Sequence, residues 1–199
     1  MEENQENKIE GGAENKEIFK KYFSFIWEFL KIIIIALAIV LPIRYFLFQP
    51  FIVKGDSMAP NFHSGDYLIV DEISYRIREP KRGDVVVFKY PLDTTQRFIK
   101  RIIGLPGETI DIKDSNVIVS KEGKALVLNE EAYIYGSKKT DGSAHIILSE
   151  NEYFVLGDNR QFSYDSRRWG VLPKEDIVGR AMLRIFPIEN FSYITKPNY

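Results

Sequence analysis

The sequence contains no cysteine among its 199 residues and only two histidines, His63 and His145. The absence of cysteine excludes a thiol nucleophile, a disulfide framework and cysteine-ligated zinc. The two histidines lack the close spacing of a metal-binding pair, which disfavours a metallopeptidase. We therefore expect no metal and no cofactor.

The sequence also lacks an excess of charge of either sign. Its 27 lysines and arginines nearly balance 28 aspartates and glutamates, which gives a formal net charge of -1. Proteins that bind nucleic acid through its phosphates ordinarily present a basic surface. The predicted partners therefore do not include nucleic acid. The length suits one domain plus an anchor, and about 150 residues can bury a core without metals or disulfides.

Residues 1–18 are acidic and polar and include two adjacent glycines. They show no apolar periodicity, so we predict a disordered tail. A hydrophobic segment follows at residues 19–48. Its part Trp27–Phe48 has about 22 residues, enough to cross a hydrocarbon core of roughly 30 Å as a helix. Glu28 and Lys31 lie inside it, three positions apart, where they can pair on one face.

A buried core helix and a cleaved signal peptide are the alternatives for this segment. A cleaved signal peptide has a short basic leader and small residues at its cleavage site, and this chain shows neither. We therefore favour an uncleaved signal-anchor in the lipid bilayer. Positive charges near the two ends predict its orientation. The charges before the apolar core are Lys16, Lys20, Lys21 and Lys31, and those after it are Arg44 and Lys54. This excess predicts a cytoplasmic N-terminus and an extracytoplasmic domain at the plasma membrane.

Residues 49–199 are predicted to form a mainly β domain of antiparallel sheets. Short apolar runs alternate with glycine- and proline-bearing turns, and no helical pattern of ten residues separates them. This pattern is typical of a sandwich or a closed barrel. The predicted strands cover residues 51–53, 66–70, 85–90, 97–103, 109–112, 116–119, 125–128, 144–148, 152–156 and 177–186, with a loop at residues 133–144.

A candidate nucleophile lies in the stretch Gly55-Asp56-Ser57-Met58-Ala59-Pro60, directly after the hydrophobic segment. Gly55 permits unusual backbone angles, and Pro60 prevents a helix from forming just here. A serine between a strand and a turn presents its hydroxyl and its own N–H outward. A nucleophilic hydroxyl and an N–H that donates to an oxyanion both need this exposure. An ordinary Asp-Ser turn is the alternative.

A serine nucleophile needs a base. His63 lies in a polar turn, and no aspartate is placed by the sequence to orient it, which disfavours a Ser-His pair. Lys100 lies in an apolar strand, where a period of two puts it on one face with Phe98 and Ile102. Burial between apolar neighbours lowers the pKa of a lysine, as a general base requires. Lys100 is therefore the candidate base, and an edge lysine that reaches solvent is the alternative.

A third stretch, Gly157–Gly170, is dense in groups that form hydrogen bonds. Ion pairs of Asp158 or Asp165 with Arg160 or Arg167 would fix the shape of this loop. A solvated charged loop is the alternative.

Taken together, these stretches resemble bacterial type I signal peptidase, a family of serine peptidases with a Ser-Lys dyad. The resemblance covers roughly residues 25–187, and the matching pieces follow the order of the family. They are Gly55–Pro60, Tyr67–Val70, Arg82–Phe88, Phe98–Glu108 and Gly157–Arg160, with Ser163, Asp165, Ser166, Arg167 and Gly170. Asn61 departs from the threonine often found after the proline of the first motif.

The resemblance implies a catalytic β-domain of coiled sheets in which Ser57 attacks the scissile carbonyl of a preprotein and Lys100 is the general base. It implies that Ser163 orients the lysine and that the Ser57 N–H is one oxyanion donor. Some members have a second donor, a serine hydroxyl, at the position of Gly55. The residues expected to structure the last loop are Asp158, Arg160, Asp165 and Arg167.

Secretory preproteins with small residues before the cut are the expected substrates, and such residues need shallow apolar pockets. We expect these pockets among Phe51, Val53, Met58 and the strand at residues 85–88. Two other readings stay open at this point. One is a self-cleaving repressor relative with a Ser-Lys dyad, which would ordinarily carry a DNA-binding module. The other is a membrane-anchored β-domain that only binds partners.

Overall fold

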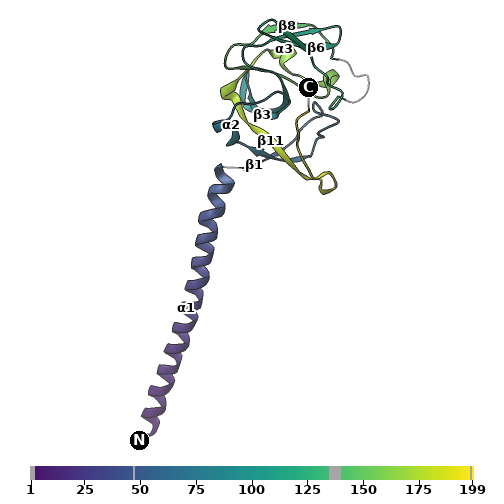
Figure 1. The fold of residues 1–199 in the computed structure, drawn as a ribbon. Helices are drawn as coiled ribbons and strands as arrows, with labels where there is room; N and C mark the ends of the chain where they lie inside the picture. The colour runs from purple at the N-terminus through teal and green to yellow at the C-terminus, as the bar shows by residue number, and fades with distance from the viewer. Residues whose placement is uncertain (1–2, 47, 135–139, 198) are drawn as a thin grey trace. The chain divides into compact units, whose positions relative to one another are not determined.

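The computed structural model describes residues 3–46, 48–134, 140–197 and 199. The chain divides into two units, of which the first ends at Tyr45 and the second begins at Phe46. The first unit contains the helix α1 (Glu3–Phe46) except for its last residue, and the second contains all the strands (Figure 1).

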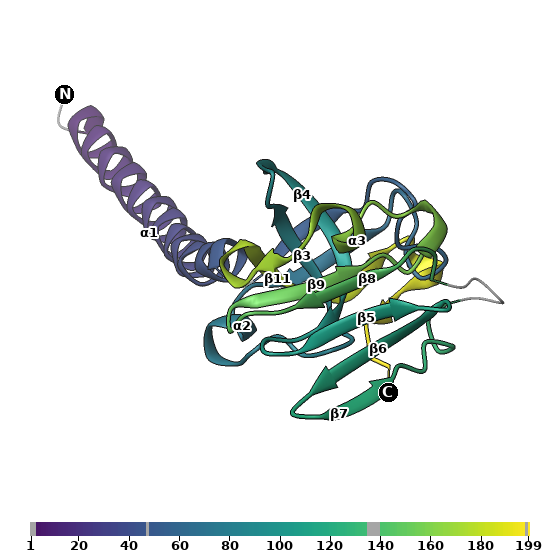
Figure 2. The ribbon, with the colours of Figure 1, turned by 90° about the horizontal axis from the view of Figure 1, so that it is seen from above.

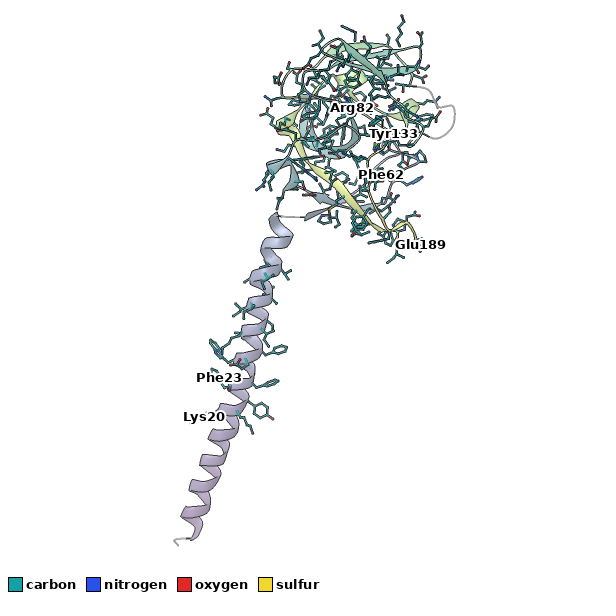
Figure 3. The ribbon with its side chains drawn as sticks, viewed as in Figure 1. Lys20, Phe23, Phe62, Arg82, Tyr133 and Glu189 are labelled. Atoms are coloured by element: carbon teal, nitrogen blue, oxygen red, sulfur yellow. The ribbon has the colours of Figure 1, made fainter. Side chains whose placement is uncertain are left out.

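The span Lys20–Leu41 of α1 is 22 residues long and is apolar enough to cross a membrane by length and composition. None of this span is buried inside the structure, which argues against a core helix. Phe23, for example, projects from the helix and is exposed (Figure 3). Lys31 and Glu28 form the expected ion pair, with a distance of 2.7 Å between Nζ and Oε1. Signal sequences share these properties, so the uncleaved anchor stays a prediction.

The helix begins earlier than the sequence predicts. Residues 3–18 are helical in the structure, where we expected a disordered tail, and the expected anchor began at residue 19. Once a helix is nucleated, each added residue gains a hydrogen bond without the cost of a new nucleus. Nine of the sixteen residues of this segment are glutamate, lysine, glutamine or alanine, which favour helix, and they outnumber its three asparagines and two glycines, which do not. The prediction from composition neglected this extension from the apolar span.

The main sheet of the second unit has eight antiparallel strands in the order β1-β2-β11-β3-β4-β9-β10, with β12 beside β11. The sequence-based prediction of a mainly β, antiparallel domain is therefore confirmed. The strands are β1 (Phe48–Ile52), β2 (Tyr67–Asp71), β3 (Val85–Tyr90), β4 (Asp93–Gly104), β9 (Glu152–Leu156), β10 (Leu172–Pro173), β11 (Ile177–Phe186) and β12 (Ser192–Tyr193).

A second sheet has the order β7-β6-β5-β8 and lies against β9 in the view of Figure 2. Its strands are β5 (Thr109–Lys113), β6 (Asn116–Lys121), β7 (Lys124–Val127) and β8 (Ala144–Ile147). Ile110 and Ile112 alternate toward the interior, where they join Phe154 and Leu156 of the main sheet in one apolar cluster. The sheets approach closely, since a Cβ atom on Gly104 would lie 2.7 Å from Ile110 Cδ1.

Strand β3, which pairs with β4 in the main sheet, is buried on both of its faces. Val85 and Val87 join the cluster that contains Ile99 and Met58. On the other face, Val86 and Phe88 join a cluster with Ile102 and Tyr153. A run of four apolar residues without alternation is what such a strand requires.

Short elements were not predicted, because two to four residues carry no periodic pattern. They include α2 (Ser74–Ile77), α3 (Ser166–Trp169), the 3₁₀ turn η1 (Arg160–Phe162), β10 and β12. The loop expected at residues 133–144 includes residues 135–139, which lie outside the described residues.

We expect Phe88→Ala to lower the free energy of unfolding by about 3–5 kcal/mol, because it removes a fully buried ring and leaves a cavity. Phe162→Ala is the matched control. Its ring is 75% exposed, so the change should stay within about 0.5 kcal/mol. Urea unfolding of both variants measures this, and equal losses would contradict the assignment of Phe88 to the core.

Candidate active site

Ser57 and Lys100, 43 positions apart in the chain, meet at one side of the main sheet. The Nζ of Lys100 lies 2.7 Å from the Oγ of Ser57. The same nitrogen donates a hydrogen bond of 3.0 Å to the carbonyl oxygen of Ile99. Ser57 lies in the turn that follows β1, and Lys100 lies in β4. His63 is exposed and is not among the residues that line the groove at this site.

The backbone on both sides of Ser57 is held by Asn159. Its side-chain amide donates to the carbonyl of Asp56 at 3.0 Å, and its backbone N–H donates to the carbonyl of Ser57 at 3.0 Å. The Asp56 carbonyl and the Ser57 N–H belong to one planar trans peptide and point in opposite directions. The first bond therefore directs the Ser57 N–H away from Asn159. Gly55, with φ of +81°, adopts the left-handed conformation that the turn requires.

Lys100 is only 4% exposed. Burial lowers the pKa of Lys100 from its ordinary 10.5 to about 8, although the negative charges of Asp165 and Asp158 oppose this shift. The Phe98 ring, on the same face of β4, has its centroid 5.6 Å from the ammonium. A substantial fraction of Lys100 is thus neutral, and able to accept a proton, at mildly alkaline pH.

Asp158 pairs with Arg101, a residue that the sequence analysis did not select. The Nε and Nη2 of Arg101 donate to the two carboxylate oxygens at 2.8 and 2.6 Å, and both side chains are buried. Arg101 also donates to the carbonyl of Gly83 at 2.9 Å. The expected partners of Asp158, Arg160 or Arg167, are therefore wrong. The sequence signal that could have identified Arg101 is the alternation of side chains in β4, which places Arg101 on the face opposite Lys100.

Asn61 is a second residue whose place the sequence did not reveal. Its amide donates to the carboxylate of Asp158 at 2.9 Å and to the backbone carbonyl of Tyr133 at 2.7 Å. These bonds tie the turn after Ser57 to the Arg101–Asp158 pair. They also show what the departure from threonine supplies here, since an amide has two N–H groups to donate.

Asp165 pairs with Arg167, as expected for the loop. The Nε and Nη2 of Arg167 donate to the carboxylate at 2.8 and 2.9 Å, and the N–H of Gly157 adds a bond of 3.0 Å. Burial alone would raise the pKa of Asp165, but the bonds from Arg167 and Gly157 outweigh burial and lower it. Asp165 is thus an anion held between the loop and the end of β9.

Arg160 is buried and has its main partner outside the predicted loop. It forms two hydrogen bonds with Glu130, one of them 2.8 Å long, and another with Thr140. Its Nε donates to the carbonyl of Gly157 at 3.0 Å. Arg160 therefore does structure the loop, through a buried ion pair that spacing in the sequence could not identify.

Ser163 is buried beside Gly157 and close to Ser57. A Cβ atom on Gly157 would collide with Ser163 Oγ and with the carbonyl oxygen of Ser57, so only glycine fits between them. Among the residues that the structure describes, Ser163 Oγ has no hydrogen-bond partner. Its expected bond to Lys100 is not formed, and its role in orienting the lysine stays a prediction.

A groove of about 710 Å³ leads to Ser57 and Lys100. Phe51 lines it, as predicted, but Val53 and Met58 do not. Both are 1% exposed and lie in a core cluster of buried residues, as do Val85 and Val87. Hydrophobicity in a sequence does not distinguish a core residue from a pocket residue. The groove is lined by Phe51, Ile52, Lys54–Ser57, Thr95–Lys100, Phe162 and Tyr164.

Over the part of the chain that the structure describes, no group of three or more histidines, aspartates or glutamates is arranged to hold a metal ion. The arrangement offers a hydroxyl, a buried amine with a lowered pKa and a groove that leads to both. These are the parts of a serine hydrolase.

Comparison with known proteins agrees with this class. The model of the family "Signal peptidase, peptidase S26" matches residues 26–186. The chain therefore belongs to the signal peptidase family S26, whose members are serine peptidases that remove signal peptides. This membership favours the peptidase over the repressor-type and binding-only alternatives.

Relatives of this chain include "Signal peptidase I P" of Bacillus subtilis subsp. natto, 40% identical over 189 residues that cover 90% of this chain and 98% of the relative. "Probable signal peptidase I-1" of Synechocystis sp. is 36% identical over 179 residues, covering 84% and 88% of the two chains. A solved structure of a signal peptidase I from Enterococcus faecalis matches with a TM-score of 0.44 at 29% identity, covering 53% of this chain and 99% of that one.

The effect of Lys100 on stability should depend on pH. Below pH 8 the lysine is charged in both the folded and the unfolded state, so the folded protein bears the full cost of burying an ammonium. Between pH 8 and 10.5 the lysine is neutral in the folded state but still charged in the unfolded state. The destabilisation of the folded state therefore decreases as pH rises through this range and disappears near pH 10.5. The stability advantage of Lys100→Met should therefore shrink by roughly 3 kcal/mol from pH 7 to pH 10.

Denaturant unfolding of wild type and Lys100→Met across this pH range measures the difference. Lys89→Met, in the neighbouring strand β3, is the control for the replacement of a lysine by methionine. A difference between wild type and Lys100→Met that stays constant with pH would contradict the lowered pKa of Lys100.

Proposed function

We propose that this protein is a membrane-anchored endopeptidase that removes signal peptides from secretory preproteins, with Ser57 as nucleophile and Lys100 as general base. The observation that carries the proposal is the 2.7 Å distance between Ser57 Oγ and the buried Nζ of Lys100. Family membership supports the activity, and the apolar span of α1 supports the anchor.

The reaction begins with neutral Lys100 accepting the hydroxyl proton of Ser57 as Oγ attacks the scissile carbonyl carbon. The new C–O bond moves the carbonyl electron pair onto oxygen. The resulting ammonium of Lys100 then protonates the leaving amine as the C–N bond breaks. A water molecule attacks the acyl-enzyme, Lys100 accepts its proton, and Ser57 recovers its hydroxyl proton as the signal peptide leaves.

The Ser57 N–H is the proposed donor to the oxyanion, since the bond between Asn159 and the Asp56 carbonyl fixes its direction. Gly55 has no hydroxyl, so a second donor would come from a backbone group or a water molecule. Ser163, buried beside Gly157, is proposed to orient Lys100 once substrate closes the groove.

The substrate is proposed to bind as an extended strand between β1 and β4. In the main sheet β1 pairs only with β2, and β4 pairs with β9 only from Arg101 onward. Both strands thus expose backbone groups where they line the groove, and a peptide can add to such an edge. The apolar surface of Phe51 and Ile99 suits small side chains before the cut.

The proposed location is the plasma membrane, with a cytoplasmic N-terminus and an extracytoplasmic catalytic domain. Ser57 lies nine residues after Phe48, the predicted end of the anchor. A signal peptide leaves the bilayer next to its cleavage site. The tether therefore raises the effective concentration of the nucleophile at that surface.

Ser57→Ala and Lys100→Met are each expected to lower cleavage of a preprotein by about 10³-fold or more, because each removes one half of the dyad. The assay uses the full chain in detergent, with circular dichroism as the check on folding. Lys89→Met is the matched control and should cleave like wild type. Cleavage by folded Lys100→Met within tenfold of wild type would overturn the assignment of the base.

The rate should also report the protonation of Lys100. Because burial lowers the pKa of Lys100 to about 8, we expect kcat/KM to rise about tenfold per pH unit below pH 8 and to level off above it. Initial rates on a soluble peptide substrate from pH 6 to 10 measure this. A profile that is flat between pH 6 and 9 would exclude Lys100 as the base.

A further inference from the structure

The chain continues beyond residue 186, where the match to the family model ends. Its residues 191–197 and 199, which we call the strap, return across the domain. β12 pairs with β11, with Leu183 opposite Tyr193, and the N–H of Ile194 donates to the carbonyl of Met182 at 2.9 Å. These bonds fix the first half of the strap to the main sheet.

The second half of the strap lies against the turn before β3 and against Tyr133. A Cβ atom on Gly83 would lie 3.0 Å from Pro197 and 3.2 Å from Tyr199, so the contact is close. The ring of Tyr199 stands edge-on to that of Tyr133 at 6.1 Å, and its hydroxyl donates to the Tyr133 hydroxyl at 3.3 Å. Figures 1 and 2 both show this end of the chain near β6, whose Val119 lies in the same apolar cluster as Tyr199.

Gly83 and Tyr133 also contact Arg101, in addition to its partner Asp158. The Gly83 carbonyl accepts a hydrogen bond from Arg101 Nη1 at 2.9 Å. The guanidinium carbon of Arg101 lies 4.4 Å from the centroid of the Tyr133 ring, where a cation is attracted. Tyr133 also accepts the bond from Asn61 through its backbone. Tyr199 therefore contacts both Gly83 and Tyr133, the residues that bind Arg101 next to its ion pair with Asp158.

The strap also walls a cavity of about 430 Å³ beside this pair, together with Asn61, Phe62, Arg101, Tyr133 and Arg184. Phe62 and Tyr133 are labelled in Figure 3, on the same flank of the domain.

From this pair the contacts lead directly to the nucleophile. Asp158 accepts the amide of Asn61, and the next residue, Asn159, donates to the carbonyls on both sides of Ser57. We propose that Tyr199 is a positioning residue for the peptidase reaction, which acts through Arg101 and Asp158 to keep Ser57 at Lys100. This proposal rests on the proposed function of the dyad.

The test compares Tyr199→Ala, Tyr199→Phe and Tyr193→Ala in the full chain in detergent. Tyr193 is the matched control, since it lies in the same strap but is 72% exposed. Tyr199 does not line the groove, so Tyr199→Ala should lower kcat about tenfold and change KM by less than twofold. Tyr199→Phe keeps the ring contact and should stay within twofold of wild type, as should Tyr193→Ala.

Hydrogen exchange gives a second readout that does not require cleavage. In Tyr199→Ala the amides of Asn159 and Phe62, which bond to the carbonyls of Ser57 and Met58, should exchange faster. Amides of β2 and β11 should keep their wild-type protection from exchange. If the substitution loosened the whole domain, these amides would exchange faster as well.

Wild-type kcat in Tyr199→Ala, or equal loss of protection throughout the domain, would overturn the positioning role. If wild type itself fails to cleave preproteins, the proposed function fails instead. The exchange of Asn159 and Phe62 then still decides whether Tyr199 supports the turn of Ser57.

Discussion

The contact between a buried amine and a hydroxyl is the interaction on which the rest of the structure depends. In the proposed reaction Lys100 accepts a proton from Ser57, which requires a site where water does not stabilise the charged form of the lysine. Burial lowers its pKa from 10.5 to about 8, which corresponds to roughly 3 kcal/mol against the ammonium. Two carboxylates, Asp158 and Asp165, lie near enough to oppose this shift. The site therefore has to retain their hydrogen bonds while limiting their effect on the lysine.

Two arginines meet this requirement. Arg101 and Arg167 each hold one carboxylate through paired N–H groups, so each negative charge is matched by a positive charge beside it. The carboxylates then act as anchor points: Asp165 holds the N–H of Gly157, and Asp158 holds Asn61. Electrostatic compensation and loop geometry are thus provided by the same contacts.

Sequence patterns predicted the features that depend on local periodicity, namely the bounds of strands and the face on which a side chain lies. The strands β3, β9 and β11 have the predicted bounds, and the face of Lys100 followed from alternation in β4. The partners of the loop were not predictable in this way, because the sheet order brings Arg101 to Asp158 across 57 positions. Val53 and Met58 were misplaced for a related reason, since burial in the core and exposure in a groove demand the same apolar side chains.

Adjacent residues of β4 serve opposite sides of the domain, with Lys100 directed to the nucleophile and Arg101 to the buried carboxylate. A shift of the strand by one residue in one direction would place Arg101 at Ser57 and Ile102 at Asp158, so that Asp158 would lose its cation. A guanidinium does not give up its proton under physiological conditions and cannot act as a base. In the proposed mechanism, peptidase activity is thereby conditional on correct strand pairing, so a chain paired in the wrong register would not cleave the proteins around it.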